Sequence, residues 1–492
     1  MGAKSVVIIG AGIGGLAAGC AARQQGFEVQ ILEMHGLPGG LCTSWARSGY
    51  TFDGSIHHLA GCRPGTPLYR MWEELGAMPT EVLFLEDLTQ VETPDGRRFT
   101  VYTDLDRLEE HMLDLFPEDR QRIRSYVSAA RKLARYDLLE TVVRPPIGLL
   151  RYLPAAPQMI RWGRFTMAQA AERFRNPFLR RAFATIQYDW PDIPVAIHLN
   201  MLAQCAQRNY GFPVGGSLPF ARSIEQRFRE LGGTIEYGQR VERILVEGDR
   251  AVGVRLADST TVEADAVISN AFAPTTLFRM LEDVEVPKAV LARFAKPSPE
   301  TVMGIHVSLG VARDLSDEPH ALVLLLDDPI VLADRTLDRI AVELYGLDET
   351  LAPPGKGVIK VLLNTDYTYW EQLAESPTRC AEAKERLGRD VVEALGARFP
   401  GLGAQVEVLD VATPLTTERY TGVGLSYTSE SGDPSLASML LGRPLTLSTV
   451  RNLWLVGQSA GGAGIPGCAA QGRHAVRALR RAHRHRFRSN TT

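Results

Sequence analysis

The first forty residues constrain the fold of this chain more than any other segment. An apolar run from Val6 to Ile9 predicts a buried parallel strand, and an Ala-rich helix is expected from about residue 16 to 25. A second strand is expected at 28–32, directly before Glu33. Between the first strand and the helix lies a GxGxxG sequence. Strand, glycine loop, helix, strand and acid in this order form the βαβ unit that binds dinucleotides.

Each part of this unit has an expected role. Gly10 allows the tight turn, Gly12 lets the backbone approach a pyrophosphate, and Gly15 lets the helix and strand pack closely. The helix N-terminus faces the phosphates, and Glu33 is placed to bind a ribose hydroxyl. The residues of this unit expected to bind a dinucleotide are Gly10, Gly12, Ile13, Gly14, Gly15, Glu33 and Met34.

The unit by itself allows NAD, NADP or FAD, and a second glycine pair bears on the choice. Gly39 and Gly40, followed by Leu41, come shortly after Glu33 and place more bare backbone beside the same ligand. An NAD-binding domain normally continues into a crossover helix at this point. Instead, the sequence GYTFDG follows at 49–54, with His57 and His58 just beyond it.

A third glycine loop lies near the C-terminus, in the sequence NLWLVGQSAGGAGIPG at 452–467. A strand is expected to run into this loop, and a helix to follow from about residue 468 to 483. The loop contains a second GxGxxG, but only about 25 residues follow it, too few for a second βαβ unit. We therefore expect this segment to return to the first domain and bind the same cofactor through Gly457, Gly464, Ile465 and Pro466.

These segments together resemble the bacterial-type phytoene desaturase, carotenoid isomerase and retinol saturase group of flavoproteins. In that group a Gly-Gly motif precedes a Gly-aromatic-x-Phe-Asp segment that returns towards the flavin, and a C-terminal Asn-x-aromatic-Leu-x-Gly runs into a Gly/Pro-rich turn. The block at 212–270 is also similar, which implies adenine contact around Val241 and a return to the flavin at Asn270. Gln458 and the Gly461-Gly462 pair depart from the strict phytoene desaturase pattern. The glycine loops and the resemblance predict FAD, not NAD, as the cofactor.

The resemblance implies an α/β fold. A discontinuous Rossmann-type FAD-binding domain, like that of glutathione reductase, would carry an inserted β-sheet substrate domain and a helical lid or membrane-facing region. The expected parts are FAD-binding pieces at 1–80, 210–285 and 441–480, substrate-domain strands at 81–104, a helical region at 105–209, a β-rich substrate domain at 286–440 and a basic, disordered tail at 481–492.

Local patterns place many elements within these parts. A hairpin is expected at 89–92 and 98–102 around an Asp-Gly turn. Strands are expected at 234–237, 241–247, 251–256, 266–269, 302–309, 321–326, 339–344, 358–364 and 405–409, and helices at 217–231 and 378–398.

Composition limits the function classes. The net charge of −3 argues against a nucleic-acid partner. The six cysteines lack metal-site spacing, so we expect reduced thiols, no metal and a cytoplasmic protein. The first strand starts almost at residue 1, so we expect no signal peptide. The sequence contains no run of 18 apolar residues, so we expect no membrane-spanning helix.

The segment 142–162 allows two interpretations. Its apolar and aromatic residues alternate with arginine and contain no acid, which suits a peripheral element on the cytoplasmic face of an anionic membrane. The same pattern suits a Pro-broken lid over an apolar pocket. The basic tail could add attraction to anionic lipid.

The expected activity is that of an FAD-dependent oxidoreductase. The resemblance implies an apolar isoprenoid or polyene, carotenoid- or retinoid-like, whose C–C bonds are desaturated, saturated or isomerised with help from the flavin. Two alternatives are an amine oxidase of the same fold and a non-catalytic lipid-binding protein. The candidate catalytic residues are His57, His58, Arg419 and Tyr420, and the electron acceptor is left open.

Overall fold

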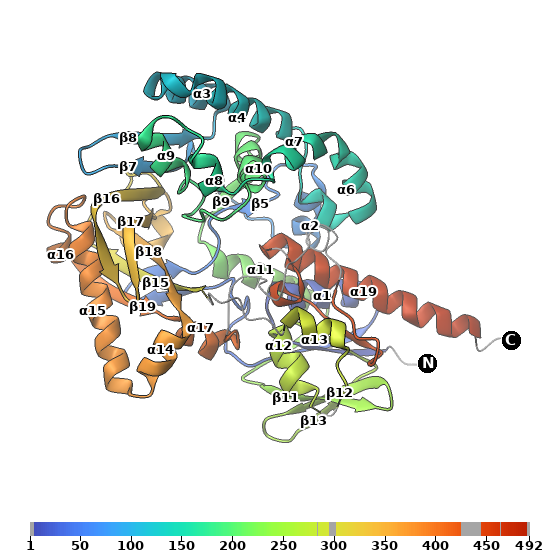
Figure 1. The fold of residues 1–492 in the computed structure, drawn as a ribbon. Coiled ribbons are helices and arrows are strands. Elements are labelled where there is room, and N and C mark those ends of the chain that lie inside the picture. The colour runs from blue at the N-terminus through green and yellow to red at the C-terminus, as the bar shows by residue number, and fades with distance from the viewer. Residues whose placement is uncertain (1–3, 283, 295–301, 425–443, 463, 490–492) are drawn as a thin grey trace.

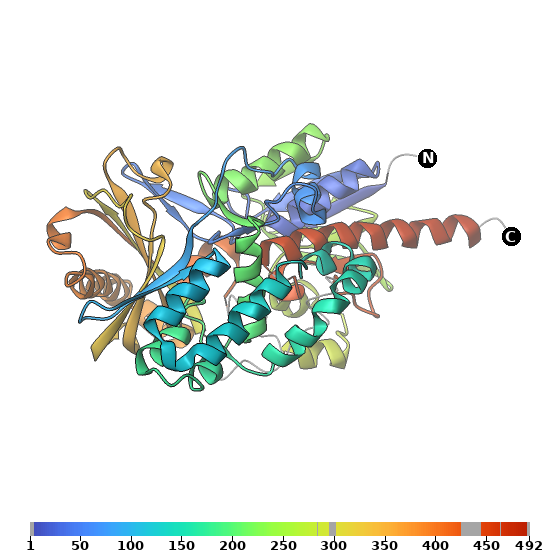
Figure 2. The same cartoon turned by 90° about the horizontal axis from the view of Figure 1, so that it is seen from above.

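The computed structural model describes residues 4–282, 284–294, 302–424, 444–462 and 464–489. Figure 1 shows a parallel sheet with its helices beside a second, larger sheet, and a layer of helices over both. Figure 2, seen from above, shows the helical layer lying across the two sheet regions and α19 extending away from them. The α/β class expected from the sequence is confirmed.

The parallel sheet is assembled from distant parts of the chain. Its strand order is β10-β2-β1-β14-β20, with β1 pairing in parallel with both β2 and β14. The central position of β1 suits its continuous apolar sequence, which is buried on both faces. The strands are β10 (Thr234–Tyr237), β2 (Glu28–Glu33), β1 (Ser5–Ile9), β14 (Ala266–Ser269) and β20 (Leu453–Leu455). The N-terminal, middle and C-terminal segments thus share one sheet, as a discontinuous Rossmann-type domain requires.

Glycines let the helices of this domain approach closely. The N-terminal helix α1 (Ile13–Gln24) lies against β1, where a Cβ on Gly15 would be 2.1 Å from the carbonyl oxygen of Gly10. Helix α19 (Gly464–Ser489) crosses α1, and a Cβ on Gly472 would be 2.2 Å from the carbonyl oxygen of Gly14. No real Cβ fits at such distances, so these contacts need glycine.

Short elements complete this domain. They are α2 (Pro67–Glu74), α11 (Ser217–Glu230), α12 (Ala273–Thr275), α13 (Lys288–Phe294), the antiparallel strands β11 (Val241–Glu247), β12 (Arg250–Leu256) and β13 (Thr261–Glu263), the pair β3 (Ser44–Arg47) and β4 (Tyr50–Asp53), and the small sheet of β5 (Leu59–Ala60), β9 (Tyr210–Pro213) and β6 (Val82–Leu83).

The larger sheet has the strand order β19-β15-β18-β17-β16-β7-β8. The predicted hairpin forms its edge, and β7 pairs in parallel with β16 at Leu322–Leu324. Alternate residues of the central strands pack against Trp370 and the apolar face of α15. The strands and helices are β7 (Asp87–Glu92), β8 (Arg98–Tyr102), β15 (Val302–Val311), β16 (Ala321–Leu332), β17 (Arg335–Leu344), β18 (Gly357–Asp366), β19 (Val406–Ala412), α14 (Tyr367–Ala374), α15 (Pro377–Leu395) and α17 (Pro414–Thr421).

The segment between the two domains is helical, as its sequence predicts. Its helices enclose an apolar core that includes Tyr126, Phe183 and Leu199. They are α3 (Leu105–Leu115), α4 (Arg120–Leu133), α5 (Glu140–Val143), α6 (Pro145–Tyr152), α7 (Ala156–Trp162), α8 (Met167–Ala171), α9 (Pro177–Phe183) and α10 (Val195–Ala206). Among the helices within the described ranges, none has the length and apolar character needed to span a bilayer.

Two sequence predictions need correction. Strands β16 and β17 are longer than expected, because after a register shift between Leu325 and Ile330 the antiparallel pairing resumes at Ile330–Leu332 with residues 335–337. The segment expected to be disordered from residue 481 is instead helical up to Ser489. From Arg473 onwards this helix contains no glycine or proline. The helix propensity of these residues therefore lets the helix continue beyond the part that packs against the core.

The contact between α1 and α19 yields a stability prediction. Gly472→Ala is expected to lower the midpoint of thermal unfolding, since overpacking costs about 1–3 kcal/mol. The matched control is Gly403→Ala in the exposed helix α16 (Leu402–Gln405), where the nearest atom to an added Cβ lies 3.8 Å away. The control should keep or raise the midpoint, because alanine favours helix by about 1 kcal/mol over glycine. Equal midpoints in the two variants would contradict this packing.

Candidate active site

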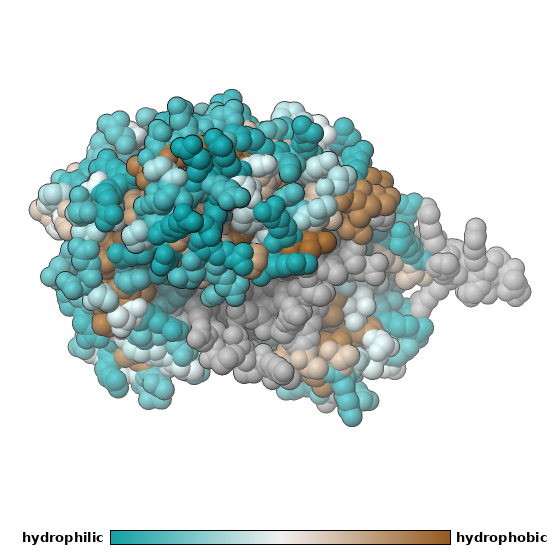
Figure 3. Space-filling view, turned by 45° about the horizontal axis from the view of Figure 1, so that its top comes forward, coloured by the Kyte–Doolittle hydropathy of each residue, from teal (hydrophilic) through white to brown (hydrophobic). Residues whose placement is uncertain are grey.

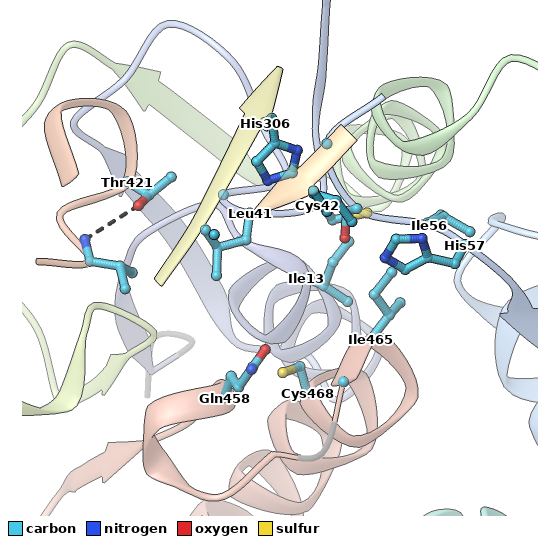
Figure 4. A pocket seen from close by; sticks show the side chains of 18 of the residues that line it. Ile13, Leu41, Cys42, Ile56, His57, His306, Thr421, Gln458, Ile465 and Cys468 are labelled. Atoms are coloured by element: carbon cyan, nitrogen blue, oxygen red, sulfur yellow. Dashed lines mark hydrogen bonds between the residues drawn. The ribbon is translucent and has the colours of Figure 1, made fainter. Parts of the chain in front are cut away.

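A cavity of about 1420 Å³ lies at the carboxyl ends of β1 and β14 and extends to the larger sheet. Figure 4 shows side chains from both domains converging on it, including Ile13, His57, His306 and Ile465. In open α/β sheets, ligands bind at this edge. The position of the cavity therefore follows from the topology of the parallel sheet.

The two N-terminal glycine loops lie directly against each other. Gly39 forms a parallel bridge with Gly12 and donates its N–H to the carbonyl oxygen of Ala11 at 2.9 Å. A Cβ on Gly40 would lie 3.4 Å from the Cα of Gly12. Gly39 and Gly40 have φ of +107° and +61°, values that favour glycine. Both loops therefore line the same part of the cavity.

The C-terminal loop joins the same site. Gly457, with φ of +99°, donates its N–H to Oε1 of the buried Gln471 at 2.7 Å. The side chain of Asn270 lies over the glycines, because a Cβ on Gly12 or on Gly457 would approach its amide at 2.6 and 2.9 Å. Asn270 therefore connects the first and third glycine loops.

Glu33 ends β2 at the rim of the cavity. Its carboxylate accepts hydrogen bonds from the backbone N–H of Ala11 at 2.7 Å and of His35 at 2.8 Å. Burial raises the pKa of this carboxyl, while the two backbone donors oppose that shift. Each carboxylate oxygen retains a further lone pair that a ligand hydroxyl can use. Gln239 and Val241 line the cavity near this carboxylate, where the sequence predicts the adenosine end.

The residues predicted to bind FAD fit a flavin dinucleotide. Apart from Gly15, they all line the cavity: Gly10, Gly12, Ile13, Gly14, Glu33, Met34, Gly39, Gly40, Leu41, Val241, Asn270, Gly457, Gly464, Ile465 and Pro466. Gly15 instead packs against Gly10. A dinucleotide site needs bare backbone, a helix N-terminus and a ribose-binding acid, and one wall of the cavity offers all three.

The candidate catalytic residues separate into two groups. His57, His58 and Arg419 line the cavity. Tyr420 is 41% exposed and contacts the ring of His35, with centroids 4.9 Å apart, so it lies outside the cavity wall. Within the described residues, no group of three or more histidine, cysteine or acidic side chains is arranged to hold a metal ion.

The structure adds residues that sequence reasoning missed. Tyr188, His306 and Glu343 line the cavity opposite the glycine loops, and Lys360 is buried behind Glu343. Burial lowers the pKa of His58 and of His306 to about 3, so both imidazoles are neutral at physiological pH. A signal was present in the sequence for Lys360, because it is a charged residue inside the otherwise apolar run at 357–363.

The fold and cavity define a class of protein: a two-domain flavoenzyme with its ligand site between a Rossmann-type sheet and a substrate-side sheet. Residues 13–480 match the family described as flavin containing amine oxidoreductase. The chain belongs to this family.

Comparison with curated proteins finds relatives at low identity. A lycopene-forming phytoene desaturase from Pseudescherichia vulneris is 26% identical, over 95% of this chain and 97% of the relative. A chloroplastic prolycopene isomerase from Daucus carota is 25% identical, over 92% of this chain and 76% of the relative. These relatives confirm the resemblance inferred from the glycine motifs.

Solved structures share the fold. An oxidoreductase from Methanosarcina mazei is similar with a TM-score of 0.57 and 21% identity, over 97% of this chain and 100% of that chain. A putrescine oxidase bound to putrescine gives a TM-score of 0.58 and 16% identity, over 97% and 98%. From the family and the site, the protein is an FAD-dependent oxidoreductase.

The packing of the glycine loops gives a direct test of the cofactor site. Gly12→Val is expected to abolish FAD retention, because its side chain would meet the amide of Asn270 and fill the approach to the pyrophosphate. Gly36→Val is the control, since nothing lies within 4 Å of its Cβ. Absorbance in the flavin bands after gel filtration measures retention. Full occupancy in the Gly12 variant would refute the site.

Proposed function

We propose that this enzyme acts on C–C bonds of a long apolar isoprenoid or polyene, by desaturation, saturation or flavin-assisted cis–trans isomerisation. The relatives named above are a desaturase and an isomerase of such molecules. The observation that carries the proposal is the apolar wall that the larger sheet contributes to the cavity: Ala321, Leu322, Val323, Leu337, Ala341, Val342, Leu362 and Leu363.

The cavity is large enough to hold a cofactor and a substrate together. A pocket for a single small ligand typically measures about 300–1,000 Å³. This cavity is larger, and it runs from the glycine loops to the larger sheet. In the proposal, FAD occupies the end lined by the glycine loops and accepts or donates a hydride there. The substrate occupies the end lined by the larger sheet.

The residues at the glycine end have distinct proposed roles towards FAD. Gly12, Ile13 and Gly14 offer the backbone and helix N-terminus to the pyrophosphate. Glu33 accepts from the ribose, and Val241 borders the adenine. The remaining contacts to the flavin half are proposed for Gly39, Gly40, Leu41, Asn270, Gly457, Gly464, Ile465 and Pro466.

An amine oxidase activity is the second candidate, favoured by the family description. Such an enzyme needs an aromatic cage for its cationic substrate. Among the described residues that line the cavity, the tyrosines are Tyr188 and Tyr210. The hydroxyl of Tyr188 is hydrogen-bonded to Nδ1 of His58. The apolar sheet wall supports the polyene better.

We also propose peripheral contact with the cytoplasmic face of a membrane through α6 and α7. Leu150, Leu153 and Ile160 are 68%, 57% and 59% exposed on these helices and the turn between them. Figure 3 shows hydrophobic residues gathered at this part of the surface. Exposed leucine and isoleucine beside arginine suit an interfacial element. A substrate that is insoluble in water would then enter from lipid.

The substrate proposal is tested by incubating the holoenzyme with a panel of polyenes and amines under air and without oxygen. A polyene whose mass changes by about two hydrogens, or whose retention alone changes, is the expected result, because the flavin transfers a hydride or assists isomerisation. Turnover of amines with no change in any polyene would contradict the proposal. Gly12→Val, which should lack FAD, serves as the inactive control.

The membrane proposal is tested by co-sedimentation with anionic phospholipid vesicles. The triple variant Leu150→Ser, Leu153→Ser and Ile160→Ser should lose most of its binding, because these side chains would no longer enter the interface. Val331→Ser is the control, since Val331 is 65% exposed on β16, outside α6 and α7. Trp162 is left intact because its ring contacts Tyr126. Equal binding by all three proteins would favour the lid interpretation.

A further inference from the structure

A buried ion pair lies behind the cavity wall. Lys360 on β18 and Glu343 on β17 face each other across the two strands, with Nζ and Oε2 2.6 Å apart. The side chains are 1% and 9% exposed. Burying two charges costs several kcal/mol per ion, and apolar replacements are often as stable. Stability alone therefore does not explain the pair.

Glu343 connects the ion pair to the cavity. Its Oε2 also accepts from the hydroxyl of Tyr345 at 2.7 Å, and its Oε1 contacts Nδ1 of His57. Burial would raise the pKa of Glu343, but its contacts with His57 and Lys360 outweigh burial and hold the pKa well below the ordinary value. An ionised carboxylate only accepts hydrogen bonds. Nδ1 of His57 must therefore carry the proton in this contact.

Lys360 also holds the loop that carries His57. Its Nζ donates to the carbonyl oxygen of Asp53 at 3.1 Å. The carboxylate of Asp53 accepts from the backbone N–H of Ser55 at 2.9 Å and of Ile56 at 3.2 Å. These residues come directly before His57 in the chain. One lysine thus fixes both the ring of His57, through Glu343, and its backbone, through Asp53.

The His57 side chain lines the cavity. It is 26% exposed and its Nδ1 faces Glu343, so Nε2 lies on the edge that faces away from the carboxylate. Figure 4 shows the ring among the cavity side chains, near Ile465. The ring of Tyr188 lies beside that of His57, with centroids 4.7 Å apart.

The neighbouring histidines are poor candidates for proton transfer. Burial lowers the pKa of His320, and that of His58 and His306 falls to about 3. Nδ1 of His58 is also engaged with the hydroxyl of Tyr188, whose own pKa burial raises well above the ordinary value. His57 differs from them in its ionised carboxylate partner. A histidine held by a carboxylate at one nitrogen is arranged to use the other as a base or acid.

We propose that Lys360 and Glu343 are positioning residues that fix His57 with Nε2 towards the cavity, and that His57 exchanges a proton with the substrate there. This inference rests on the proposed function. In a desaturation, one substrate C–H bond breaks and its proton passes to Nε2. The neighbouring carbon loses a hydride to FAD, and the two carbons form the new double bond. In a saturation, one carbon of the double bond takes a hydride from reduced FAD and the other takes the proton from Nε2, so that the double bond becomes a single bond.

The first test needs no substrate. Holoenzyme labelled with ¹⁵N-histidine should show a protonated Nδ1 for His57, assigned by its loss in His57→Gln. The signal should disappear in Glu343→Leu/Lys360→Met, which removes both charges together and so leaves no unpaired buried ion. Lys356→Met is the control, because Lys356 forms a similar 2.6 Å pair with the exposed Glu407. An unprotonated Nδ1, or a signal unchanged in the double variant, would overturn the positioning role.

The second test measures the rate of flavin bleaching or recovery in a single turnover with a polyene that the enzyme accepts. His57→Gln should slow this step by about 100-fold or more. The Glu343→Leu/Lys360→Met variant should slow it by a similar factor, and adding His57→Gln to it should have little further effect, because all three act through one proton. If the triple variant instead loses rate by the product of the two separate factors, the residues act independently and the proposal is contradicted.

The two tests separate the possible failures. If no polyene reacts but Nδ1 behaves as expected, the proposed function fails and the proton exchange with it, while the positioning of His57 stands. If polyenes react but His57→Gln is as fast as the natural protein, the proton role of His57 fails while the proposed function stands.

Discussion

The close approach of three glycine loops at one edge of the parallel sheet is the constraint on which the rest of the structure depends. Gly12, Gly39 and Gly457 come from the N-terminal and C-terminal parts of the chain, and Asn270 lies over the first and the last of them. A side chain on Gly12 or Gly39 would meet neighbouring atoms below 3.0 Å. Because these loops meet only in the folded protein, the edge of the cavity that they form exists only when the discontinuous domain is assembled.

The larger sheet forms the other side of the cavity, because successive side chains along its strands point alternately to the core and to the cavity. Residues such as Val307 and Val361 pack towards α15, while His306 and Glu343 point to the cavity side. The same strands thus build a stable core and an apolar wall for a substrate. Glu343 lies on the cavity side, at the point where the loop carrying His57 reaches the sheet.

The sequence predicted what is encoded locally. The βαβ unit, the hairpin at 89–102 and the helices at 105–209 follow from periodicity and turn residues, and the structure has them. All but one of the residues that the glycine motifs and the resemblance predict to bind FAD line the cavity. The pairing of Glu343 with Lys360 was not predictable because it depends on the register of β17 against β18, and the contacts of both with residues 53–57 join segments about 300 residues apart. The helical end of α19 was not predictable from charge, because its dense positive charge favours disorder while its alanine, leucine and arginine residues favour helix.

The most direct test of the account is an experimental structure of the holoenzyme with a bound polyene. The account predicts FAD stretched from Glu33 to the start of α19, and the polyene along β16 and β17 with one of its reacting carbons near Nε2 of His57. FAD bound elsewhere, or a polyene bound away from the cavity, would contradict it.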